Sequence, residues 1–96
     1  MVLAAGLEGI EQTMDPGDPN RDNMYELPPA ELEARGIRQL PRSLGEALDC
    51  FEADPLSTAV MGRTMAEAWR DYKRAAWLSY TTHVSEWETA RYLRFF

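Results

Sequence analysis

Several kinds of chemistry need residues that this 96-residue chain has in very small number. His83 is the only histidine, so a metal site built from several imidazole ligands is excluded. Cys50 is the only cysteine, so no internal disulfide can form, and a reducing compartment such as the cytoplasm is expected. The chain also lacks a glycine-rich phosphate loop and a Cys-x-x-Cys motif. We therefore predict no catalytic residue and no metal ligand in this chain.

Positive charge and long apolar runs are also scarce. The net charge is −6 and no basic stripe exists, which argues against nucleic acid or an anionic membrane as a partner. No apolar run approaches the roughly 20 residues of a membrane span, and the first residues lack the basic start of a signal peptide. Hydrophobic residues still make up 45% of the chain, which excludes full disorder. These features predict one small soluble domain in the cytoplasm.

No segment alternates apolar and polar residues as a strand does, so the predicted fold class is all-α. It comprises several short helices, one long amphipathic helix and a long proline-rich loop. Residues 1–14 are predicted to be the first helix, without a capping side chain. Its apolar residues are Leu3, Leu7, Ile10 and Met14. Gly6 and Gly9 each weaken it by about 1 kcal/mol, which would make sense if another element packs closely on that face.

Residues 15–29 are predicted to be a loop, because they hold four prolines and repeated Asp, Asn and Gly. A loop of this length in a small domain is usually functional or disordered. Tyr25 lies in its middle among acidic residues. Its side chain either packs down as an anchor, which is the interpretation that we favour, or is displayed for modification or contact.

Residues 30–62 are predicted to form short helices, each marked by its start and stop signals. In chain order these signals are Pro28-Pro29 with Gly36, the capping box of Ser43 and Glu46, and Asp54-Pro55 with Gly62. Cys50 lies on the second of these helices, between Leu48 and Phe51. It is predicted to be a buried, inert thiol rather than a nucleophile.

Residues 64–96 are predicted to be a long helix followed by an aromatic tail. The apolar side of the helix consists of Met65, Ala68, Trp69, Tyr72, Ala76, Tyr80 and His83, and its polar side of Arg70, Asp71, Lys73 and Arg74. Thr64 and Glu67 form a predicted capping box at its start, and the helix is expected to end near Thr82. His83 is predicted to be a C-terminal cap or a packing residue.

A second Ser-x-x-Glu start at Ser85 predicts a last short helix, with Glu86 and Glu88 complementing its dipole. All three tryptophans and three of the four tyrosines lie in residues 63–96. So many aromatic side chains exceed what a small chain buries comfortably, and an exposed apolar surface of this kind signals a missing partner. We expect this tail to dock on another surface.

Four motifs give the chain a family likeness. The first two are Ala4-Ala5-Gly6-Leu7-Glu8-Gly9-Ile10 followed by Asp15-Pro16-Gly17, and Asn23-Met24-Tyr25-Glu26-Leu27-Pro28. The other two are Leu40-Pro41-Arg42-Ser43-Leu44-Gly45-Glu46-Ala47-Leu48, and His83-Val84-Ser85-Glu86-Trp87-Glu88 followed by Arg91-Tyr92-Leu93. In this order and spacing they resemble the C-terminal region of bacterial glutamine synthetases, over nearly the whole chain.

The resemblance implies that residues 1–96 are the C-terminal segment of a catalytic domain that joins glutamate to ammonia or another amine. Members of that family use ATP and Mg or Mn, and their metal- and substrate-binding residues precede the part that this chain resembles. No cofactor is therefore expected in this chain, which we predict to be catalytically incompetent alone. Its expected partners are glutamine synthetase-type subunits in a homo-oligomer.

The same resemblance assigns roles to two sets of residues. Tyr25 occupies the place of the tyrosine that is adenylylated in some members, although Arg21 and Asp22 depart from the usual pattern before Asn23. The terminal residues Tyr92, Leu93, Phe95 and Phe96 match a tail that contacts the facing ring of a double hexamer. The alternative is a tail folded onto its own subunit.

Three other interpretations remain open. The chain could be a free-standing helical interaction module that binds or modulates full-length glutamine synthetase subunits. It could also be an unrelated acidic helical binding protein. In the third, it is one part of a longer polypeptide that does catalyse.

Overall fold

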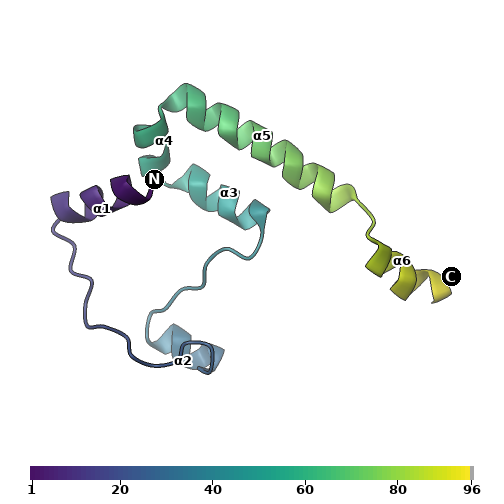
Figure 1. The fold of residues 1–96 in the computed structure, drawn as a ribbon, viewed down its shortest axis with the longest axis horizontal. Helices are drawn as coiled ribbons and strands as arrows, with labels where there is room; N and C mark the ends of the chain where they lie inside the picture. Colours follow the sequence, from purple (N-terminus) through teal and green to yellow (C-terminus); the bar gives the residue numbers. More distant parts are fainter. Residues whose placement is uncertain (96) are drawn as a thin grey trace. The chain divides into compact units, whose positions relative to one another are not determined.

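The structure is a computed structural model that describes residues 1–95 (Figure 1). It divides into an N-terminal unit, residues 1–41, and a C-terminal unit that begins at Arg42. Every regular element of the described residues is a helix, which confirms the all-α class. The N-terminal unit holds α1 (Val2–Glu11) and α2 (Pro29–Ala34). The C-terminal unit holds α3 (Leu44–Ala53), α4 (Pro55–Met61), α5 (Arg63–Thr82), α6 (Glu86–Tyr92) and the 3₁₀ turn η1 (Leu93–Phe95).

Helix α1 ends at Glu11, three residues before the end that its apolar pattern predicts. The physical reason is a Schellman motif, in which Thr13 adopts φ +51° and the Met14 N–H donates to Gly9 O at 2.9 Å. The expectation of close packing at Gly6 and Gly9 is wrong within the described residues. A Cβ built at either glycine meets nothing within 4 Å.

Helix α2 has the predicted start and stop. Pro29 is its first residue, where the missing N–H costs nothing, and Gly36 ends it with φ +71°. The Ile37 N–H then donates to Leu32 O at 2.9 Å, which completes a second Schellman motif.

The starts of α3 and α4 lie where the sequence predicts them. The Ser43 hydroxyl accepts from the Glu46 N–H at 3.1 Å, and the Glu46 carboxylate accepts from the Arg42 N–H at 2.8 Å. The Asp54 carboxylate accepts from the Leu56 N–H at 2.9 Å, with Pro55 at the first helical position. These side chains satisfy backbone donors that a helix start leaves without partners.

Helix α5 runs from Arg63 to Thr82, close to its predicted span, but the capping box of Thr64 and Glu67 is wrong. Gly62, at φ +76°, ends α4 and is also the N-cap of α5, so the N-cap lies two residues before the predicted one at Thr64. Thr64 then lies inside the first turn, where it is not the N-cap. His83 is the C-cap residue of α5, in agreement with its predicted position, and its side chain is exposed.

Helices α3 and α4 pack against α5 around a small core. Leu48 of α3 and Ala66 of α5 are its buried apolar residues, and the Ser57 side chain of α4 is buried as well. Gly45 of α3 is buried against Trp77 of α5. A Cβ at Gly45 would lie 2.7 Å from the Trp77 ring, so only glycine permits this close approach.

An ion-pair cluster crosses the same interface at the polar side of α5. The Arg74 guanidinium donates to Asp49 at 2.6 Å and to Glu52 at 3.1 Å, and both carboxylates belong to α3. These hydrogen bonds, the one to Glu52 first, raise the pKa of Arg74 above its ordinary value. The arginine thus connects positions 25 and 22 residues apart in the sequence.

The face of α5 that packs is not its apolar side. Ala66, Arg70, Arg74 and Trp77 are its half-buried or buried residues, together with Lys73. At 100° per residue, this face is turned by about 100° from the predicted apolar side. The sequence therefore identifies the helix and its apolar side, whereas the structure packs α3 and α4 on the adjoining side.

Cys50 is exposed, so the prediction of a buried thiol is wrong. Leu48, two residues earlier, takes the buried position of α3, and residues two apart face different ways on a helix.

Among the described residues, no helix has the length and apolar character needed to cross a membrane.

Candidate functional site

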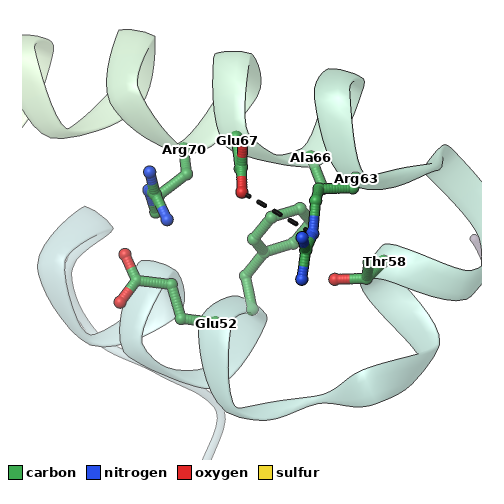
Figure 2. A pocket seen from close by; sticks show the side chains of 7 residues that line it. Glu52, Thr58, Arg63, Ala66, Glu67 and Arg70 are labelled. Atoms are coloured by element: carbon green, nitrogen blue, oxygen red, sulfur yellow. Dashed lines mark ion pairs between the residues drawn. The ribbon is translucent and has the colours of Figure 1, made fainter.

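A polar hollow of about 250 Å³ opens where α3, α4 and α5 meet (Figure 2). Its lining comprises Phe51 and Glu52 of α3, Thr58 of α4, and Arg63, Ala66, Glu67 and Arg70 of α5. Figure 2 shows Glu52 on one side of the hollow with Arg70 above Glu52, and Arg63 beside Thr58. Two guanidinium groups and two carboxylates therefore surround one small space.

The charges of this hollow are compensated by partners within its lining and next to it. Arg63 and Glu67 form an ion pair at 3.9 Å, and the Arg70 guanidinium donates to Asp71 at 2.8 and 2.9 Å. The hydrogen bonds to Asp71 raise the pKa of Arg70, and the charge of Asp71 adds to that effect. The described lining includes neither imidazole nor thiol, and the Glu67 carboxylate, which pairs with Arg63, is not placed by any hydrogen bond to activate the Thr58 hydroxyl.

A divalent metal, which the family resemblance implies for a longer parent, does not fit the residues present here. Among residues 1–95, no three side chains of His, Cys, Asp or Glu come together in a way that could hold an ion. A divalent cation needs several oxygen or nitrogen ligands at one point. No step of a reaction is therefore derived through a metal in this chain.

Tyr25 lies in a tight turn of the N-terminal unit, and its side chain is fully exposed (100%). The Asn23 side chain accepts from the Tyr25 N–H at 3.1 Å, and the Glu26 N–H donates to Asn23 O at 3.2 Å. This Asx turn presents the tyrosine at the tip of the loop. Within the described chain, the interpretation of Tyr25 as a packed anchor is wrong.

Arg35, the C-cap residue of α2, connects to the base of this loop. Its guanidinium donates to Asp22 at 2.6 Å and to Glu31 at 2.6 Å, so it ties residues 13 positions apart. These hydrogen bonds, the one to Asp22 first, raise the pKa of Arg35. Asp22 is the residue whose position departs from the usual family pattern, and here it is the ion-pair partner of Arg35.

The residues of the aromatic tail lie on α6 and η1 with little cover from the described chain. Tyr92 meets Trp87 edge-to-face with ring centroids 6.1 Å apart, and the Arg91 guanidinium lies 5.3 Å from the centre of the Trp87 ring. Leu93 and Phe95 are exposed, Phe95 at 82%. Phe96, the fourth tail residue of our prediction, lies outside the described residues.

A capping box fixes the start of α6 as predicted. The Ser85 hydroxyl accepts from the Glu88 N–H at 3.2 Å, and the Glu88 carboxylate accepts from the Ser85 N–H at 2.8 Å. The backbone hydrogen bond from Ser85, followed by the one from its hydroxyl, lowers the pKa of Glu88. Glu86 and Glu88 both lie in the first turn, which confirms their predicted place at the positive end of the helix dipole.

An apolar groove of about 300 Å³ runs beside the tail and is lined by Val84, Glu88, Thr89, Tyr92 and Leu93. Together with the display of Tyr25, it suggests a chain that offers surfaces for contact rather than a set of reacting groups. The described residues thus define a helical segment with exposed aromatic faces.

Comparison with known proteins shows the family to which this helical segment belongs. Residues 1–92 match the family model described as "Glutamine synthetase, catalytic domain". The chain belongs to the glutamine synthetase catalytic-domain family, which confirms the resemblance.

Characterised relatives agree with this assignment. A glutamate–methylamine ligase of Methyloversatilis universalis is 43% identical over 95 residues, which cover 99% of this chain and 21% of that protein. A glutamine synthetase of Halobacterium salinarum is 42% identical with the same coverages, and one of Archaeoglobus fulgidus is 38% identical over 90 residues. The chain therefore spans about one fifth of the length of these relatives and corresponds to their C-terminal part.

Proposed function

We propose that this chain is the C-terminal segment of a glutamine synthetase-type, ATP-dependent ligase that forms a γ-glutamyl amide. In this proposal its role is subunit packing and oligomer assembly, and it supplies no reacting group of its own. One relative is named as a glutamate–methylamine ligase and the others as glutamine synthetases. Both chemistries are therefore candidates for the parent enzyme, which we expect to reside in the cytoplasm.

The observation that supports this role best is the exposed surface of the chain. It exposes 8766 Å². Even two separate compact units of the same total mass would together expose roughly 6,800 Å². Among residues 1–95 the buried apolar residues are Leu48 and Ala66, whereas large apolar side chains are exposed on α1, α5, α6 and η1. Such surfaces are typical of a segment that packs on other protein.

The assembly contacts are proposed to include Tyr92, Leu93, Phe95 and Phe96. The first three lie on α6 and η1 next to the apolar groove, and their exposure favours docking on a neighbouring subunit over a tail folded onto this chain. The partners are then further subunits of the same ligase in a homo-oligomer. ATP and Mg or Mn would be held by the parts of the ligase that correspond to the preceding four fifths of the relatives.

Tyr25 is proposed as a site of adenylylation, supported by its full exposure at the tip of an Asx turn. Incubation of the chain, embedded in an active ligase, with ATP and a cognate adenylyltransferase would add one AMP to wild-type protein. Tyr25→Phe would remain unmodified, as read by intact mass spectrometry. Labelling of the Phe variant would place the modification elsewhere.

Catalytic incompetence is tested with the purified chain, glutamate, ATP, Mg²⁺ or Mn²⁺, and either hydroxylamine or methylamine. We expect no γ-glutamyl product above the rate without protein, because no metal-binding set lies among residues 1–95. Metal-dependent turnover by the chain alone would overturn this part of the proposal. A full-length relative assayed in parallel is the positive control.

A second candidate function is a free-standing helical module that binds ligase subunits. The packing of α3 and α4 on α5, with the glycine contact to Trp77 and the Arg74 ion pairs, favours it, since these contacts lie within one unit. Near-ultraviolet circular dichroism separates the two candidates. A module gives fixed aromatic signals in isolation, whereas a segment that needs the rest of its domain gives weak ones and binds hydrophobic dyes.

A further inference from the structure

Helix α5 carries an apolar stripe that the described residues of its own unit leave exposed. The stripe consists of Met65, Trp69, Tyr72, Ala76 and Tyr80, which recur at the spacing of one helix face. Met65, Tyr72 and Tyr80 are exposed at 61%, 68% and 71%, and Trp69 at 45%. Because α3 and α4 pack on the adjoining face, the stripe lies free along most of the length of the helix.

The side chains of the stripe are held in place before any partner arrives. The Tyr80 ring stacks on Trp77 with centroids 5.7 Å apart, and Trp77 itself is fixed against Gly45. The Lys73 ammonium lies 4.6 Å from the centre of the Trp69 ring and 5.5 Å from that of Tyr72. Aromatic side chains with few free rotations lose little entropy on binding, and they carry most of the energy of protein interfaces.

We infer that this α5 stripe is a docking face for the preceding part of the ligase catalytic domain. The inference rests on the proposed function and adds a second surface, separate from the tail of α6 and η1. The chain corresponds to only 21% of each of two relatives that it matches along 99% of its own length. In these two relatives the larger part of the protein thus lies outside the region that this chain matches.

Charge favours this occupant over a second copy of the chain. The stripe holds no charged residue, and Lys73 at its edge is the one cation that borders its aromatic rings within 6 Å in the described residues. The whole chain carries a net charge of −6, so two copies repel each other when their stripes approach. A protein surface that is apolar in the middle, with an acidic group facing Lys73, fits the stripe better.

The test uses hydroxyl-radical footprinting of the chain alone and of a hybrid ligase. In the hybrid, residues 1–96 replace the matching C-terminal part of the Methyloversatilis universalis glutamate–methylamine ligase. Methionine, tryptophan and tyrosine are the residues that this method reports well. We expect oxidation of Met65, Trp69 and Tyr72 to fall by about fivefold in the hybrid, as the fully buried centre of an interface requires. Leu78, exposed at 64% on the opposite side of α5, is the internal reference.

Two variants of the hybrid and one control variant test the docking face by the yield of active ligase. Trp69→Glu and Tyr72→Glu put a charge into the stripe and are expected to lower the yield of active ligase by about tenfold. Leu78→Glu puts the same charge on the other side of α5 and is expected to leave that yield unchanged. Equal losses in all three variants would overturn the docking face.

The outcomes separate the inference from the function on which it rests. A wild-type hybrid without ligase activity overturns the proposed function. An active hybrid whose stripe is oxidised as fast as in the chain alone overturns the docking face and leaves the function standing. Protection of the stripe in the isolated chain, with a dimer in sedimentation, would assign the face to a second copy instead.

Discussion

The two sides of helix α5 differ in what they contact, although both belong to one continuous helix. One side meets α3 and α4 through Ala66, Trp77 and the Arg74 ion pairs. The other side carries the stripe of Met65, Trp69 and Tyr72, which the described residues of its unit leave exposed. The apolar side of an amphipathic helix therefore need not be the side that packs on its neighbours in the chain. In a segment of a larger domain, the nearest neighbours can take a more polar face and leave the apolar one for a distant partner.

The largest loss of stability is expected from a substitution in the core on the packed side of α5. Leu48→Ala removes the apolar side chain with the least exposure, 3%, and is expected to lower the free energy of unfolding of the α3–α5 packing by about 3 kcal/mol. Urea denaturation followed by near-ultraviolet circular dichroism measures it. Leu40→Ala, at a leucine that is 86% exposed, is the matched control and should change little. Similar effects at both leucines would mean that α3 does not pack on α5 as described.

Gly45→Ala tests the contact between α3 and the Trp77 ring. The added methyl group would lie 2.7 Å from that ring, so the two helices must move apart, at an expected cost of about 1–2 kcal/mol. Tryptophan fluorescence and the same denaturation measurement report the change. Gly9→Ala is the matched control, because its Cβ meets open space within α1, and it should stabilise that helix by about 1 kcal/mol. A stabilising effect at Gly45 would contradict the close approach.

The contribution of the Arg74 ion pairs to the packing of α3 is tested by substitution and by salt. Arg74 binds two carboxylates of α3, whereas the partner of Arg63 in the described residues is Glu67 of its own helix, at 3.9 Å. Arg74→Gln should therefore speed the hydrogen exchange of α3 amides, and Arg63→Gln should not. At high salt the wild-type protein should approach the exchange rates of Arg74→Gln, because exposed ion pairs are screened. Exchange that is independent of both salt and Arg74 would remove the ion pairs from the packing.

The smallest expected effect concerns acid and the start of α6. Because the folded pKa of Glu88 is lowered, its contribution to stability is present above the ordinary glutamate pKa of about 4.3 and is lost as pH falls through the lowered value. Carbon chemical shifts of residues 85–89 from pH 7 to pH 2.5 should report fraying of α6 in acid. Glu88→Gln should remove most of this pH dependence. Glu86→Gln, at the other acidic residue of the first turn, should keep it.

Local signals made most of the helix starts and stops predictable. Ser43, Asp54-Pro55, Ser85 with Glu88, and Gly36 each act on backbone groups within a few residues, so their chemistry can be inferred from the sequence alone. Two local predictions failed, at Thr64 and at the end of α1. At Thr64 the helix starts earlier, after Gly62 at φ +76°, and at the end of α1 the backbone bonds of Thr13 and Met14 close the helix early.

The surfaces were less predictable than the helices. The sequence favours Tyr25 as an anchor and Cys50 as a buried thiol, but both are exposed in the described chain. Burial depends on which elements meet, and residues far apart in sequence decide that. The family resemblance, by contrast, followed from motifs in order along the chain, and the family match over residues 1–92 confirmed it.

By itself, the sequence determined that this chain is helical, where most of its helices begin and end, and to which family it belongs. These features depend on contacts within a few residues or on the order of motifs. Only the tertiary structure decided that α3 approaches α5 at Gly45, that Arg74 binds two carboxylates of α3, and that the α5 stripe is left uncovered. The reason is physical: the packing of one helix face depends on the shape and charge of a surface encoded more than 20 residues away.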